Sequence, residues 1–214
     1  MIDKSKNGFT IIEVFAVFLL ILGVTFFILP RILDNTKQAS FISKWSEKYT
    51  ELEYISSVIK AQDDTELKKK FKKAKNNEVM AEVALQTVKP YLRIKSGVAQ
   101  SEYKQFYMNK ESVKKWDKYY VDNFYLTEEN QIVGLKWLTK DCHYKTVCGI
   151  LIFDLNGVQK PNTWGKDIFG INILDKGIEP IGKNEDAETL KGDCSRIGVG
   201  VSCSYFYLIG GDFD

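Results

Sequence analysis

The sequence predicts an α+β protein, in which a long N-terminal helix packs on a head that carries further helices and a C-terminal antiparallel sheet. Three observations predict this fold. The chain has one long apolar segment near its N-terminus, an amphipathic segment follows it, and β-branched and aromatic residues dominate from Tyr119 onward. Helices that precede the strands, rather than alternating with them, are typical of α+β proteins.

The apolar segment over residues 9–29 is long enough to cross a membrane. It reads FTIIEVFAVFLLILGVTFFIL and carries one charged residue, Glu13. At about 1.5 Å per residue, such a helix matches the thickness of a bilayer core. The apolar stretch is too long for an ordinary secretory signal, and no small-residue cleavage site follows it. Lys4 and Lys6 precede it, which predicts a cytoplasmic N-terminus and an extracytoplasmic head.

The residues GFTIIEV at positions 8–14 resemble the N-terminal segment of type IV pilins and type II secretion pseudopilins. The resemblance implies that prepilin peptidase cuts between Gly8 and Phe9 and that the new N-terminal Phe9 is methylated. It also implies that Glu13 is an assembly residue. On this basis the chain divides into a leader (1–8), a transmembrane or filament-core helix (9–29), an amphipathic continuation (30–61) and a head (62–214).

Glu13 has a physical reason to act in assembly. A lone carboxylate in lipid costs several kcal/mol and is typical of a functional position with a nearby partner. The α-amine of a neighbouring Phe9 is a suitable partner in a filament. The alternative is that Glu13 lies among the lipid headgroups.

The resemblance implies a structural subunit of a type IV pilus, a secretion pseudopilus or a DNA-uptake filament. It is expected in the bacterial inner membrane and then in an extracytoplasmic filament. The expected partners are other pilin or pseudopilin subunits, prepilin peptidase, the inner-membrane assembly machinery and the membrane. The formal net charge of +2 gives no reason to expect nucleic acid. The alternative is a membrane-anchored extracytoplasmic module that binds a ligand.

Beyond the membrane segment, the pattern predicts a continuing helix to about Ala61. Apolar residues from Phe41 to Ile59 recur every three or four positions. Gly23 and Pro30 are the expected weak points of this helix, since proline removes a backbone donor and clashes with the preceding turn. Pro30 has a second interpretation, namely that it ends the membrane span.

The head is predicted to contain a second helical stretch and then strands. Asp63 and Asp64 are candidate caps of the stretch, and Pro90 is expected to end it. Its lysine-rich run over 67–75 is interpreted as a solvated face, with a membrane surface, DNA or an acidic partner as the alternative. Residues 101–118 are expected to add helical turns. The predicted strands cover 119–126, 132–138, 149–153, 170–174 and 199–209.

Four cysteines in an extracytoplasmic head favour two disulfides. Closeness in sequence favours Cys142 with Cys148 and Cys194 with Cys203, the second joining C-terminal strands, although three connectivities are possible. A zinc site assisted by His143, the one histidine, is the alternative.

A loop over 153–170, FDLNGVQKPNTWGKDIFG, is a candidate calcium site. Its charged ligands are expected to be Asp154 and Asp167, with Asn156 and a carbonyl near Val158 helping. The loop resembles one found in pseudopilin-like proteins, some of which bind calcium. The alternative is a loop without metal that Asx hydrogen bonds hold, because Asp, Asn and Gly are also the residues of turns.

No motif for nucleophilic, phosphate-binding or zinc-dependent catalysis occurs in the sequence. His143 follows Cys142 directly, and neighbouring residues on a strand point to opposite faces, which disfavours a Cys/His pair. The protein is therefore expected not to be an enzyme.

Overall fold

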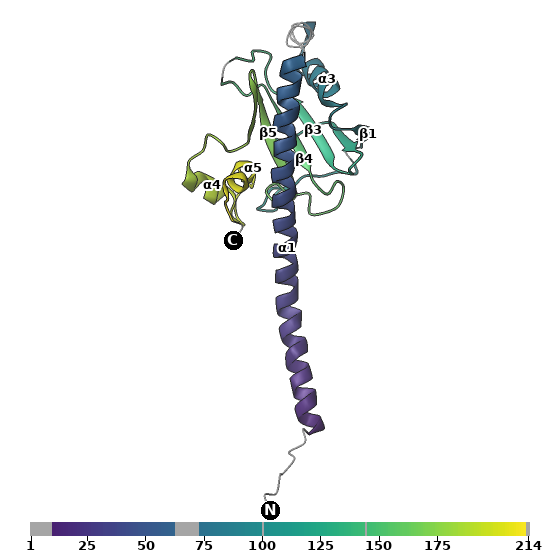
Figure 1. Cartoon of the computed structure of the whole chain (residues 1–214), viewed down its shortest axis with the longest axis vertical. Helices are drawn as coiled ribbons and strands as arrows, with labels where there is room; N and C mark the ends of the chain where they lie inside the picture. Colours follow the sequence, from purple (N-terminus) through teal and green to yellow (C-terminus); the bar gives the residue numbers. More distant parts are fainter. Residues whose placement is uncertain (1–9, 63–72, 100, 144, 213–214) are drawn as a thin grey trace, which may run out of the picture. The chain divides into compact units, whose positions relative to one another are not determined.

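The computed structural model describes residues 10–62, 73–99, 101–143 and 145–212 (Figure 1). The chain forms two compact units, Met1–Ser40 and Phe41–Asp214. The predicted processing residues Gly8 and Phe9 lie outside the described residues, as do the candidate caps Asp63 and Asp64 and most of the lysine-rich run.

Helix α1 extends over Ile11–Gln62 and belongs to both units. The predicted continuation to about Ala61 is therefore confirmed. Pro30 lies inside α1, so it does not end the helix. Thr25 and Thr36 donate their hydroxyls to the carbonyls of Ile21 and Ile32, which keeps these polar groups bonded within the helix.

The Phe41–Asp214 unit contains a six-stranded antiparallel sheet whose strand order follows the chain (Figure 1). The strands are β1 (Ile94–Val98), β2 (Phe124–Thr127), β3 (Ile132–Trp137), β4 (Gly149–Asp154), β5 (Ile168–Leu174) and β6 (Gly177–Pro180). The predicted strands over 132–138, 149–153 and 170–174 are confirmed as β3, β4 and β5. The predicted strand over 119–126 is shortened to β2, whereas β1 and β6 were not predicted.

Both faces of the sheet are covered, which explains why all six residues of β4 are buried. Leu151 and Phe153 face a core that includes Trp45 and Leu52 of α1. Ile152 faces a second core, on the other side of the sheet, made with residues of the 101–123 segment and with Trp164. A strand buried on both faces reads as a continuous apolar run instead of an alternating one.

Trp45 anchors the second half of α1 to the sheet. It is fully buried and stacks on Phe169 of β5, with 5.1 Å between the ring centroids. Its indole Nε1 donates a 2.7 Å hydrogen bond to the carbonyl of Ser204. Apolar packing and this hydrogen bond therefore both hold this part of α1 against the sheet.

Helix α3 (Asn77–Val88) confirms part of the predicted second helical stretch. The side chain of Asn76 caps it by accepting a 2.8 Å bond from the backbone N–H of Val79. Lys89 is its C-cap, and Pro90 follows in a turn, so the predicted end at Pro90 is confirmed.

Two predicted secondary-structure segments were wrong. The expected strand over 199–209 is absent, and residues 203–209 are helical, as α5 (Cys203–Phe206) and the 3₁₀ helix η1 (Tyr207–Ile209). Its aromatic residues pack into the core from helical turns, and burial alone does not specify a strand. The expected helical turns over 101–118 are instead turns and isolated bridges, as between Phe106 and Ser112.

Both disulfides occur at the pairs that sequence closeness favours. The Cα atoms are 5.1 Å apart in Cys142–Cys148 and 5.3 Å apart in Cys194–Cys203. Contrary to the prediction, the second bridge does not join strands. It links the end of α4 (Ala187–Asp193) to the start of α5. Because all four cysteines are paired, they offer no thiolate for the alternative zinc site.

Candidate functional site

The N-terminus of α1 forms a capping box between Thr10 and Glu13. The carboxylate Oε2 of Glu13 accepts bonds from the backbone N–H of Thr10 at 2.8 Å and from its hydroxyl at 2.9 Å. The backbone N–H of Glu13 donates to Thr10 Oγ1 at 3.3 Å. A threonine followed three residues later by glutamate, before an apolar run, is the sequence signature of such a box. Sequence analysis had identified Glu13 but had missed its partner.

The first part of α1 exposes an apolar surface on all sides. Between Ile11 and Leu33, the large apolar side chains are 48% to 88% exposed. Within the part of the chain that the structure describes, α1 is the one helix that is long and apolar enough to cross a membrane. Water does not stably surround a surface of this size and composition, so lipid or protein must cover it.

A second candidate site is the loop between β4 and β5, which holds two buried carboxylates. Asp154 is the last residue of β4, and Asp167 directly precedes β5; they are 1% and 0% exposed. Asn162 and the two glycines Gly157 and Gly165 have φ values of 49°, 73° and 75°, in the left-handed region. These tight turns fold the loop back so that both carboxylates lie inside the head.

Asp167 holds the loop through its two carboxylate oxygens. Oδ2 accepts a 2.8 Å bond from the backbone N–H of Asn162, and Oδ1 accepts a 2.6 Å bond from that of Thr163. Burial raises the pKa of Asp167 to about 6, while these bonds act in the opposite direction. Asp167 therefore holds the loop by bonds that reach back four and five residues, and these differ from an Asx turn, in which the side chain bonds the backbone two residues further on.

Asp154 is bonded to a residue that sequence analysis did not identify. The phenolic hydroxyl of Tyr103 donates a 2.7 Å bond to Asp154 Oδ2, and the backbone N–H of Asn156 donates to Oδ1 at 3.2 Å. Burial, followed by the nearby charge of Asp167, raises the pKa of Asp154 well above its usual value. Burial and the charge of Asp154 also raise the pKa of Tyr103 well above 10. No local pattern could reveal Tyr103, because 51 residues separate it from Asp154.

The loop offers oxygen donors that suit a hard cation. Besides the two carboxylates, the side-chain Oδ1 atoms of Asn156 and Asn162 are buried, and no hydrogen-bond donor reaches them within the described residues. Calcium binds carboxylate and amide oxygens, and its charge would offset the repulsion between Asp154 and Asp167. The side chain of Val158 is 53% exposed, at the outer part of the loop. The residues therefore fit calcium, which stays a prediction, and the hydrogen bonds also hold the loop without metal.

Within the described residues, no group of three or more His, Cys, Asp or Glu side chains is placed to hold a metal ion. Amide and carbonyl oxygens would thus have to complete any calcium site in this loop. No family model matches the sequence, and no curated protein or solved structure matches the chain.

Proposed function

We propose that this protein is a pilin-like or pseudopilin-like subunit that inserts into the membrane through α1 and assembles into a filament. The observation that carries the proposal is the all-round apolar exposure of α1 between Ile11 and Leu33. In a membrane, lipid covers this surface. In a filament, the same segments of neighbouring copies cover one another through apolar helix packing.

Glu13 has two roles in this proposal. Before assembly, its carboxylate satisfies the backbone N–H and hydroxyl of Thr10, so the charge is hydrogen-bonded at the helix N-terminus, where the helix dipole favours it. During assembly, the carboxylate pairs with the α-amine that cleavage after Gly8 creates on a neighbour's Phe9. The pairing fixes the stagger between adjacent helices because the apolar segment carries no other charge.

Replacing Glu13 by glutamine separates its capping role from its charge-pairing role. Glu13→Gln keeps an oxygen that can cap Thr10, since glutamine also serves in capping boxes, but it removes the charge. We expect cross-linking of intact cells to give oligomer ladders with the wild-type chain, and only inserted monomer with Glu13→Gln or Glu13→Ala. Thr10→Ala should keep the ladders, because it removes the two bonds of the threonine hydroxyl, a cap worth about 1 kcal/mol, and leaves the charge.

Two outcomes contradict the proposal. Wild-type ladders that persist in Glu13→Gln would assign Glu13 to capping alone. If cross-linking of the wild-type chain gave no oligomer ladders, the proposed filament function would be wrong. N-terminal mass analysis of the native protein tests the processing step separately, since a methylated Phe9 is expected at the start of the mature chain.

The second candidate function is a membrane-anchored module whose head binds a ligand. One observation favours it, an apolar cavity between α1, α3 and the sheet. A monomer that stays functional after Glu13→Ala would support this alternative.

A further inference from the structure

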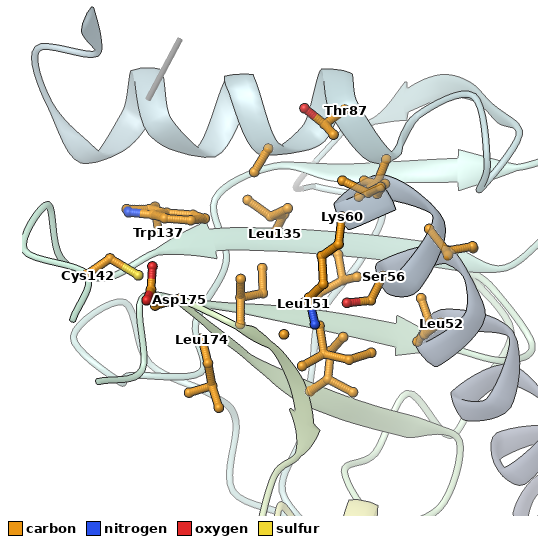
Figure 2. A pocket seen from close by; sticks show the side chains of 18 of the residues that line it. Leu52, Ser56, Lys60, Thr87, Leu135, Trp137, Cys142, Leu151, Leu174 and Asp175 are labelled. Atoms are coloured by element: carbon orange, nitrogen blue, oxygen red, sulfur yellow. The ribbon is translucent and has the colours of Figure 1, made fainter. Parts of the chain in front are cut away.

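A cavity of about 450 Å³ lies within the Phe41–Asp214 unit, between the last turns of α1, α3 and one face of the sheet, and it is partly open to solvent (Figure 2). Its walls are mostly hydrocarbon. Representative lining residues are Leu52 and Ile55 of α1, Met80 of α3, and Leu135, Leu151 and Ile171 of the sheet. Small-molecule sites are typically concave, apolar and of roughly 300–1,000 Å³, with a few polar groups that orient the ligand.

Lys60 supplies a charged group to this apolar cavity. It belongs to the last turn of α1, and Figure 2 shows its side chain extending along the cavity with the ammonium directed toward the strands. Its Nζ lies against Gly177, where an added Cβ would meet it at 2.8 Å. Within the described residues, no hydrogen bond or ion pair involves this ammonium.

Of the other polar side chains that line the cavity, Ser56 lies on α1 near Lys60 (Figure 2), and three are less suited to bind an anion. The hydroxyl of Thr87 donates to the carbonyl of Val83, and the ammonium of Lys140 donates to the carbonyl of Lys75. Asp175 lies near Cys142, to one side of the cavity, and Figure 2 shows the Lys60 ammonium nearer its middle. The Lys60 ammonium is therefore the cation best placed to meet an anionic ligand, and most of the remaining wall is hydrocarbon.

We propose that this cavity binds a free fatty acid, with its carboxylate on Lys60 Nζ and its chain along the apolar walls. A flexible acyl chain gains from the burial of each methylene and needs no polar partner in the wall. A carboxylate forms a strong charge-assisted bond with the ammonium. A purely apolar ligand would leave that charge desolvated and unpaired, and a peptide would bring backbone groups for which the walls offer few partners.

Photoaffinity labelling of the full chain tests this site. The chain is reconstituted in lipid nanodiscs, irradiated with a diazirine analogue of palmitic acid, and digested for peptide mapping by mass spectrometry. We expect labelled peptides from α3 and from β3 to β5. Palmitic acid should compete with this labelling, whereas hexadecan-1-ol, which has the same chain and no charge, should compete weakly.

Lys60→Met should lower labelling of the head by about tenfold, as expected for the loss of one charge-assisted bond. Lys60→Arg should retain most of it. Lys44→Met is the matched control, because Lys44 is exposed on the same helix and does not line the cavity. Ala84→Phe should also abolish labelling, because its ring would fill the space beside α3.

Labelling confined to residues 11–29, equal competition by hexadecan-1-ol, or head labelling unchanged in both Lys60→Met and Ala84→Phe would each overturn the proposal. The result is independent of filament assembly. Glu13→Ala should leave the labelling of the head unchanged, so a failure here does not bear on the proposed filament function.

Discussion

The hydroxyl of Tyr103 donates a 2.7 Å hydrogen bond to the buried Asp154 and so ties the 101–123 segment to the end of β4. Tyr103→Phe would keep the ring in place and leave Asp154 Oδ2 without this donor. An unsatisfied buried acceptor costs about 1–3 kcal/mol. We therefore expect the free energy of unfolding to fall by that amount in urea titrations of the detergent-solubilised chain. Tyr54→Phe, at a position that is 70% exposed, is the control and should change it little.

Asp167 should make the stability of the head depend on pH. Its folded pKa of about 6 lies above the usual value of 3.8, so between these values the folded state binds more protons than the unfolded state. This contribution to the free energy of unfolding is present below about pH 4 and is lost as pH rises through about 6, by on the order of 3 kcal/mol. We expect urea titrations with a calcium chelator to record this loss.

Asp167→Asn should flatten this pH dependence, because it removes the titrating group and the charge that raises the pKa of Asp154. Asp212→Asn, at an exposed position, is the control and should keep the wild-type profile. A wild-type profile that rises from about pH 4 to about pH 7 by the same amount would contradict the direction of the pKa shift.

Calcium should raise the melting temperature of the head. A ligand present at 100 times its Kd stabilises the folded state by about 2.7 kcal/mol, which for a chain of this size raises Tm by roughly 5–10 °C. Asp154→Ala should abolish the shift, and Asp212→Asn should keep it. A melting temperature that millimolar calcium leaves unchanged in the wild-type chain would favour the metal-free loop.

The parts of the fold that sequence analysis predicted are those with strong local patterns. The strands β3 to β5 are largely apolar runs. Asn130, with a φ of 59°, lies in the turn before β3, and Gly177 follows the turn after β5. By contrast, β1 reads IKSGV and has three exposed residues, so it lacks the alternation of a half-buried strand. β6 includes Pro180, which lowers the expectation of a strand.

The candidate sites were predicted where they depend on neighbours in sequence. Glu13 and the Asp154 loop follow from short motifs, although the Thr10 cap was present in the same motif and was overlooked. Tyr103 and Lys60 could not be predicted, because their roles depend on elements that only the tertiary fold brings together. Composition also did not indicate that Phe206 and Tyr207 would pack on the core from helical turns.

Substitution of Trp45 tests how the second half of α1 is fixed to the sheet. The ring is fully buried against Phe169, and its Nε1 donates to the carbonyl of Ser204. Trp45→Ala removes both contacts and leaves a cavity, so the free energy of unfolding should fall by about 3–5 kcal/mol. Trp116→Ala is the matched control, because Trp116 is 82% exposed and its loss should change stability by less than about 0.5 kcal/mol.

Trp45→Phe separates packing from hydrogen bonding. Phenylalanine keeps much of the contact with Phe169 but leaves the carbonyl of Ser204 without its indole donor. The fall in the free energy of unfolding caused by Trp45→Phe should therefore lie between the values for Trp45→Ala and Trp116→Ala. If urea titrations gave equal values for Trp45→Ala and Trp116→Ala, α1 would not be held by this contact, and its second half would have to be fixed to the sheet by Leu52 and Ile55 instead.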